Sequence, residues 1–150
     1  MLYIFALNGS FESLLVLDNI NIMAVVVAAV ASFVLGGYWY YEKVFGRRWQ
    51  NLVGLNKKDI ENTNMTHLLI GALLLTFVQA LFLAFVMASL NITHTIEGFL
   101  FGSLVGLTFG AASLGVQYLY AQRKLELFAI DAGYIVAQFA IMGLILGWWQ

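Results

Sequence analysis

The chain has 150 residues, of which 62% are hydrophobic and only 10% are charged, and it contains neither cysteine nor proline. A soluble domain carries roughly 25% charged residues, so this composition excludes a soluble globular enzyme, a disordered tail and a disulfide-stapled secreted fold. Seven Lys and Arg residues stand against eight Asp and Glu residues, which argues against nucleic acid as a partner because no basic surplus neutralises phosphates. An integral membrane protein remains, with the lipid bilayer as its first partner.

Long charge-free stretches predict four membrane-spanning helices. A helix needs about 20 apolar residues to cross a hydrocarbon core of about 30 Å. The runs of this chain predict helices at about 21–41, 67–90, 98–120 and 128–149. Because they do not alternate polar with apolar residues, a membrane β-barrel is excluded. The expected fold is an all-α integral membrane four-helix bundle, with residues 1–150 forming a single transmembrane domain.

The segment before the first predicted helix does not read as a cleaved leader. A secretory signal begins with a basic segment, whereas no Lys or Arg precedes Lys43 in this chain. Residues 1–17 are therefore expected to lie against the outer surface of the bilayer.

An amphipathic helix is predicted at about 43–53, after the first span. Apolar side chains recur there at spacings of three to four, at Phe45, Trp49, Leu52 and Val53. Arg47, Arg48, Gln50 and Asn51 fall between them, and such a helix with a basic face lies in the headgroup region of a membrane. Gly54 is placed to end this helix, and Asn56 with Asp59 resembles a capping pair that begins the next one.

Small residues recur every four positions in each predicted span. The most regular series is Gly98, Gly102, Gly106 and Gly110, and the last span carries Gly143 and Gly147. Lipid gives helices no hydrophobic reason to associate, so small residues that allow close backbone approach hold them together. Two interpretations remain: tight packing within one bundle, or an interface with a second copy or another membrane protein, including a glycine-lined pore.

The basic residues predict the orientation of the chain. All seven lie either between the first and second predicted helices or between the third and fourth. With four spans these two loops share one side of the membrane. The positive-inside rule then places both loops in the cytoplasm and both termini outside, and it makes the helix at 43–53 cytoplasmic.

Polar groups within the predicted spans are the candidates for chemistry, namely Asp131, Gln138, Gln117 and His67. An intramembrane carboxylate is a functional-site hypothesis because a charge there is expensive unless it is paired. In a carrier, Asp131 would move protons with His67 as a second titrating group. Alternatively, Asp131 interacts with its own helix dipole and with Arg123 or Lys124. The glutamines are expected to form hydrogen bonds between helices.

Familiar catalytic motifs are absent from the sequence: it contains no GxSxG, no HExxH and no P-loop. His67 and His94 fall at opposite ends of the second predicted helix, and roughly 40 Å of helix at about 1.5 Å per residue separates them. They are too far apart to share a metal within one chain. No catalytic residue, metal or cofactor is therefore expected, and the protein is not expected to be an enzyme.

Several short motifs resemble one family. They are Gly36-Gly37-Tyr38-Trp39-Tyr40, then Phe45-Gly46 and Trp49, and later Asp131-Ala132-Gly133-Tyr134 and Met142-Gly143 with Gly147. From about Asn21 onward the chain is similar to the family called domain of unknown function 1761, which consists of small bacterial four-helix membrane proteins. It departs where the family tends to place Ser-Pro after Trp-Tyr, having Tyr41-Glu42 instead. The resemblance implies the fold and a bacterial inner membrane, but no activity and no catalytic residue.

Two functions of different classes remain open from the sequence. The first is a non-enzymatic helix-packing module, either a homo-oligomer or an accessory subunit that docks through its small-residue helix faces. The second is a small oligomeric channel or proton-coupled carrier, with Asp131 at its cytoplasmic mouth. The first and third helices run in the same direction, so the chain lacks the inverted repeat of many transporters. This favours the module.

Overall fold

The computed structural model describes residues 20–55 and 62–149. The expectations for residues 1–17, and for Asn56 with Asp59 as a helix start, fall outside these ranges. Every regular element in the described ranges is helical. Four stretches are long and apolar enough to cross a membrane: Ile22–Trp39, Met65–Ser89, Thr95–Tyr120 and Leu125–Trp148. The prediction of an all-α chain with four such helices is confirmed.

The first span is α2 (Ile22–Trp39), which begins at a side-chain cap. Asn21 Oδ1 accepts hydrogen bonds from the backbone N–H groups of Met23 and Ala24, at 3.0 and 3.2 Å. These bonds satisfy two amides that have no partner within the helix. Directly after α2 come the π-helical turn η1 (Glu42–Gly46) and the short helix α3 (Arg47–Val53). Gly54 ends α3 with a left-handed φ of 85°, as predicted for a glycine at that position.

The second span is α5 (Met65–Ser89), which starts two residues before the predicted boundary. Asn64 Oδ1 accepts a hydrogen bond of 3.2 Å from the backbone N–H of His67, so the helix extends into the polar residues before the apolar run. The third span is continuous but contains three elements, α6 (Thr95–Val105), the π-helical turn η2 (Gly106–Ala111) and α7 (Ala112–Tyr120). The last span is α8 (Leu125–Trp148).

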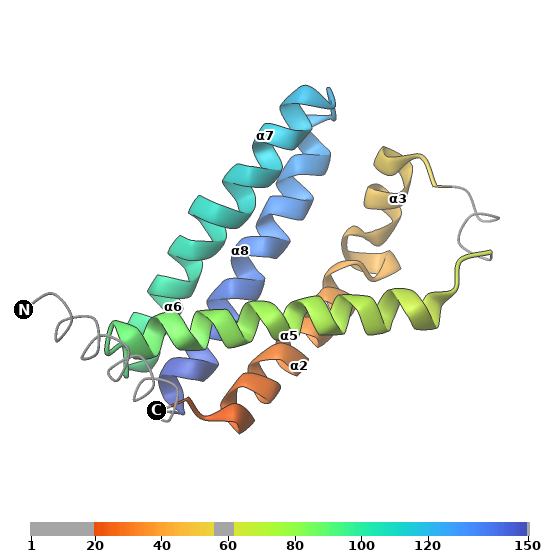
Figure 1. Cartoon of the computed structure of the whole chain (residues 1–150). Helices are drawn as coiled ribbons and strands as arrows, with labels where there is room; N and C mark the ends of the chain where they lie inside the picture. The colour runs from red at the N-terminus through yellow and green to blue at the C-terminus, as the bar shows by residue number, and fades with distance from the viewer. Residues whose placement is uncertain (1–19, 56–61, 150) are drawn as a thin grey trace, which may run out of the picture.

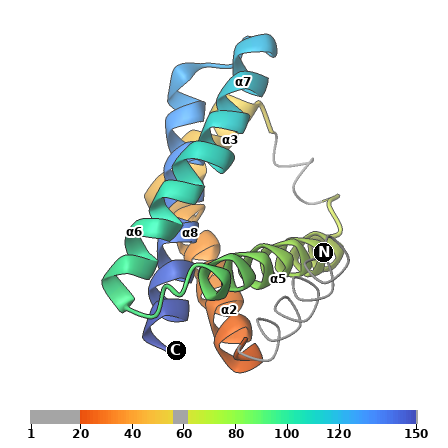
Figure 2. The same cartoon turned by 60° about the vertical axis from the view of Figure 1, so that its left-hand side comes forward.

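The helices pack as a close pair with two further helices against it (Figures 1 and 2). The α6–α7 span runs alongside α8, while α2 packs against both α8 and α5. In Figure 1, α5 crosses the other spans obliquely instead of running parallel to them. Small and medium-sized side chains from α2, α5 and α8 form the core: Ala24, Val25, Ala28, Ala29, Ala80, Leu83, Ala84, Met87, Met142 and Leu146.

The predicted glycine series brings the backbones of α6 and α8 into direct contact. A Cβ atom added at Gly98 would lie 2.2 Å from the carbonyl oxygen of Gly143, and one at Gly102 would lie 2.1 Å from that of Phe139. The remaining glycines of the two series would also meet atoms of the opposite segment: Gly106, Gly110 and Gly147. Both glycine faces are therefore used within this chain, as in the first of the two interpretations above.

The π-helical turn η2 explains how glycines spaced by four stay on one face. On a regular α-helix a spacing of four drifts by about 40° per step, because each residue turns by about 100°. A π turn closes its hydrogen bonds from i to i+5 and is wider than an α turn, so it offsets that drift. Gly110 consequently still faces α8, where an added Cβ would lie 2.3 Å from Ile135 Cγ2.

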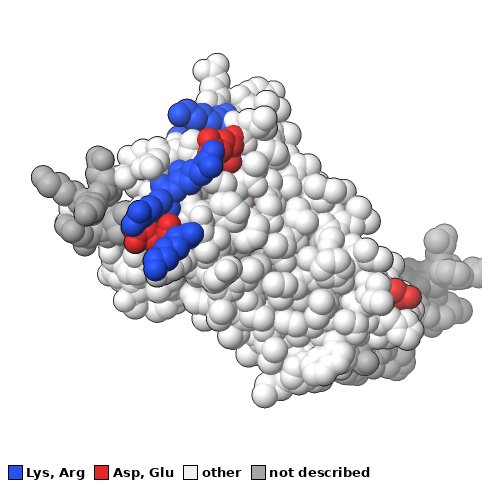
Figure 3. Space-filling model, turned by 180° about the vertical axis from the view of Figure 1, so that it is seen from behind, with Lys and Arg blue, Asp and Glu red and all other residues white. Residues whose placement is uncertain are grey.

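The described Lys and Arg side chains gather at one end of the molecule. Figure 3 shows them there with acidic residues between them, next to a broad surface without charge, and acidic atoms appear again at the opposite edge. Arg48 of α3 forms an ion pair with Glu126 of α8, and Arg47 forms one with Glu42 at 2.6 Å. The first pair ties α3 to the beginning of the last span.

Candidate functional site

Asp131 of α8 is held by two tyrosine hydroxyl groups from two other segments. The Tyr40 hydroxyl donates to Asp131 Oδ1 at 2.7 Å, and the Tyr118 hydroxyl donates to Asp131 Oδ2 at 2.6 Å. Tyr40 is the residue that ends α2, and Tyr118 lies near the end of α7. These three residues, called the Asp131 cluster below, therefore connect three spans through one carboxylate.

Chain direction explains why these side chains meet. Both α2 and α7 run toward the end of the molecule at which α8 begins (Figure 1). Tyr118 and Asp131 lie on either side of the short connection between α7 and α8, residues 121–124. Each lies within about two helical turns of that connection, so both are at the same end of the α7–α8 pair. Their short sequence separation of 13 residues is a signal from which Tyr118 could have been considered as a partner, whereas Tyr40, 91 residues from Asp131, carries no such signal.

The protonation of Tyr40 suits its role as a donor. Burial, followed by the hydrogen bond to Asp131 and the charge of that carboxylate, raises the pKa of Tyr40 above its ordinary value. A low-dielectric surrounding disfavours the phenolate, and a neighbouring negative charge disfavours it further. The Tyr40 hydroxyl therefore keeps its proton across the physiological pH range and remains a donor to Asp131.

Aromatic rings fix the position of Tyr40. Its ring meets the ring of Tyr134 edge-on, with centroids 5.2 Å apart, and that of Trp49 edge-on at 5.5 Å. Edge-to-face contacts of this kind are favourable beyond the apolar area that they bury. Trp49 belongs to α3, so the rings anchor that helix against the end of α2.

The other residues of the aromatic motif anchor the same corner. Trp39 Nε1 donates a hydrogen bond of 3.1 Å to the carbonyl oxygen of Ile130, and its ring lies 4.9 Å from that of Phe45. Gly46 is buried, and a Cβ there would lie 2.2 Å from the carbonyl oxygen of Tyr40. The motif Trp39, Tyr40, Phe45, Gly46 and Trp49 thus folds the chain back at the end of α2.

Gln138 forms a second polar contact between helices, deeper in α8. Its side-chain Nε2 donates to Gln79 Oε1 of α5 at 2.6 Å. Its backbone carbonyl oxygen accepts a hydrogen bond of 3.3 Å from Ser32 Oγ of α2. For Gln138 the predicted hydrogen bond between helices is therefore present.

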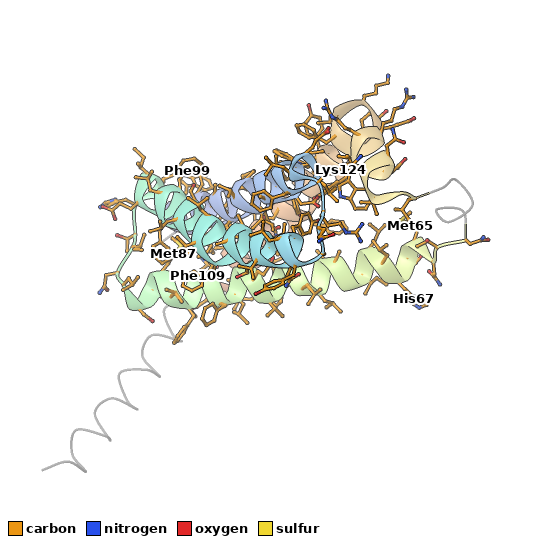
Figure 4. The ribbon with its side chains drawn as sticks, turned by 90° about the horizontal axis from the view of Figure 1, so that it is seen from above. Met65, His67, Met87, Phe99, Phe109 and Lys124 are labelled. Carbon is orange, nitrogen blue, oxygen red and sulfur yellow. The ribbon has the colours of Figure 1, made fainter. Side chains whose placement is uncertain are left out.

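The other predicted site residues, Gln117 and His67, take part neither in the Asp131 cluster nor in the hydrogen bonds of Gln138. Gln117 is exposed, and its side chain forms no hydrogen bond within residues 20–55 and 62–149. His67 is also exposed, and Figure 4 shows its side chain pointing away from the other helices. Asp131 forms no ion pair with Arg123 or Lys124 in the described part of the chain. The tyrosine hydroxyl groups take the place of the basic partners that the sequence offered.

Replacing Gln138 with leucine should lower the free energy of unfolding by about 1 kcal/mol, since one hydrogen bond between membrane helices contributes roughly 0.6–1.7 kcal/mol. The substitution also leaves Gln79 without a partner. The double variant Gln79→Leu/Gln138→Leu should be more stable than the sum of the single effects predicts. Unfolding in mixed micelles measures all three variants, and strictly additive losses would contradict the pairing.

Comparison with known proteins identifies one family. The family model described as "Protein of unknown function (DUF1761)" matches residues 23–147, which is most of the chain. No curated protein and no solved structure matches the chain.

Proposed function

Because the chain belongs to the DUF1761 family, whose description assigns no activity, we propose a function from the geometry alone: a non-enzymatic, multi-pass membrane module in which Asp131 fastens three helices together. The observation that carries this proposal is that both oxygens of the Asp131 carboxylate accept hydrogen bonds. Each Asp131 oxygen accepts a hydrogen bond from a different segment, at 2.6–2.7 Å. An acceptor that is ionised strengthens such bonds.

The same geometry is unfavourable for a proton carrier. A carrier carboxylate has to exchange its proton with each side of the membrane in turn. In this chain, protonating Asp131 would weaken hydrogen bonds that hold the ends of α2 and α7. His67, the second titrating group of a carrier, points away from the bundle (Figure 4). These observations support the module over a channel or carrier that uses Asp131.

We also propose that this module lies in a bacterial inner membrane with its basic end in the cytoplasm and both termini outside. The gathering of basic side chains at one end supports this orientation (Figure 3). In this orientation α3 lies at the cytoplasmic surface, where an amphipathic helix with aromatic and basic side chains is stable. The opposite end would then carry Glu97, in the first turn of α6.

The partner of the module is proposed to be a second copy or a larger membrane complex. The glycines of α6 and α8 contact each other within the chain, so a partner would bind elsewhere. Native mass spectrometry after gentle extraction from the membrane distinguishes the two. A complex with other proteins would establish an accessory subunit, and a discrete homo-oligomer would establish self-association.

Reconstitution into liposomes tests the choice between module and carrier. Vesicles that contain the protein and a trapped pH-sensitive dye should show the same proton leak as protein-free vesicles, for the wild type and for Asp131→Asn. The expectation follows from the closed hydrogen bonding of Asp131. Proton flux through the wild type that Asp131→Asn abolishes would overturn the module and establish the carrier.

A further inference from the structure

A cavity of about 570 Å³ opens between α2, α3 and α5. It is lined from α2 by Phe33 and Gly37 and from α5 by Leu69 and Ala72. Sites for small molecules and cofactors have volumes of about 300–1,000 Å³, lie between the helices of bundles and are mostly apolar. Figure 1 shows α5 crossing α2 obliquely, and residues of both helices line the cavity.

The lining of the cavity changes along its length. Toward α3 it contains amphipathic and polar side chains, Tyr40, Trp49 and Gln50. Toward the middle of α2 and α5 it is apolar except for Thr76, whose hydroxyl donates to the backbone of its own helix. Among the described residues that line it, none is Lys, Arg, Asp or Glu. An apolar cavity stays free of water and binds apolar molecules, so the inner part of this cavity suits a hydrocarbon chain.

The hydroxyl groups of the cavity wall differ in whether they have a partner. The Tyr40 hydroxyl donates to Asp131, and Thr76 Oγ1 donates to the carbonyl oxygen of Ala72. The Tyr134 hydroxyl, which belongs to a lining residue, forms no hydrogen bond with any described residue. A hydroxyl group at membrane depth is stabilised by an acceptor, because water does not reach it there. A ligand with a carbonyl oxygen at this point would supply that acceptor.

We propose that the cavity binds one membrane phospholipid, with an acyl chain between α2 and α5 and an ester carbonyl oxygen that accepts a hydrogen bond from the Tyr134 hydroxyl. The bilayer around a spanning chain supplies this ligand directly. The polar end of the cavity suits the headgroup, because Trp49 and Gln50 of α3 line it. The neighbouring Arg47 and Arg48 form ion pairs with Glu42 and Glu126, so among the described residues of α3 the headgroup meets polar side chains and no unpaired charge. The phosphate of the lipid lies toward α3. The site does not depend on the role of Asp131.

Two glycines allow the cavity to be filled with a matched control. A Cβ added at Gly37 or at Gly71 would meet no atom within 4 Å, so a larger side chain fits at either position. Gly37 lines the cavity, and Gly71 is not among its lining residues. Gly37→Leu therefore fills the binding site, while Gly71→Leu makes the same chemical change on α5 outside it.

Native mass spectrometry of gently extracted protein measures the bound lipid. The wild type and Gly71→Leu should each retain one phospholipid. The fraction of Gly37→Leu that retains a phospholipid should be lower by a factor of roughly ten or more, which corresponds to a modest loss of binding free energy. Equal lipid retention by the wild type and Gly37→Leu would overturn the proposal. So would an equal loss in both glycine variants, a wild type without lipid, or a lipid-soluble quinone in place of the phospholipid.

A second experiment tests the hydrogen bond and does not depend on filling the cavity. Delipidated wild type should bind a diester phospholipid about 2–10-fold more tightly than the matching dialkyl ether lipid, which has no carbonyl oxygen, because one hydrogen bond contributes about that factor. Tyr134→Phe keeps the ring and should abolish the preference, while Tyr120→Phe, an exposed control, should keep it. A preference that survives Tyr134→Phe, or that is absent from the wild type, would refute the assigned contact.

Discussion

Replacing Gly102 with valine should cause a large loss of stability, about 3 kcal/mol or more, because overpacking typically costs 1–3 kcal/mol even where side chains can yield. A Cβ at Gly102 would lie 2.1 Å from the carbonyl oxygen and 2.9 Å from the carbonyl carbon of Phe139. Both atoms belong to the backbone of α8, so no rotamer change relieves the clash. The α6 and α8 helices would have to separate, and the neighbouring contact of Gly98 with Gly143 would be lost with them.

Gly71→Val is the matched control for this prediction, because a Cβ at Gly71 meets open space. With alanine the two positions should differ in sign. Gly102→Ala should destabilise the protein, whereas Gly71→Ala should stabilise it by about 0.5–1 kcal/mol through its higher helix propensity. Thermal unfolding in detergent, followed by circular dichroism, gives the Tm of each variant. Equal shifts for the two valine variants would refute the close contact of α6 with α8.

Replacing Asp131 with alanine should lower the free energy of unfolding by about 2–4 kcal/mol, because each hydrogen bond to a charged group contributes about 1.5–3 kcal/mol. Both the Tyr40 and the Tyr118 hydroxyl groups lose their acceptor. The carboxylate is half-buried, which keeps the expected loss below the sum of two fully buried bonds. Asp131→Asn retains one carbonyl acceptor and should fall between the wild type and the alanine variant.

A double-mutant cycle separates these bonds from other effects of the substitution. Tyr40→Phe and Tyr118→Phe should each destabilise the wild type but have little further effect in the Asp131→Ala background, since the bond is already absent. Tyr120→Phe serves as the control, because Tyr120 is 88% exposed, and it should leave the Tm unchanged. Additive losses in the cycle would show that the tyrosines stabilise the fold independently of Asp131.

The sequence by itself determined the four spans and the glycine faces. Transfer of a helix into lipid depends on the side chains of that segment alone, and a run of small residues marks close contact whatever helix lies opposite. The helix boundaries were predicted less accurately from the sequence. For example, α5 starts at Met65 rather than His67, because the Asn64 cap acts through hydrogen bonding while hydropathy registers only the apolar part of a helix.

Only the tertiary structure decided which polar groups meet. Tyr40 and Asp131 are 91 residues apart, and their contact follows from the packing of α2 against α8, which no local pattern encodes. The structure also decided that Gly98 meets Gly143, and that the course of α5 leaves a cavity beside Gly37 and Tyr134. Such features depend on the relative placement of whole helices. That placement is set by the sum of many weak contacts across the bundle, and each segment contributes only one side of every contact.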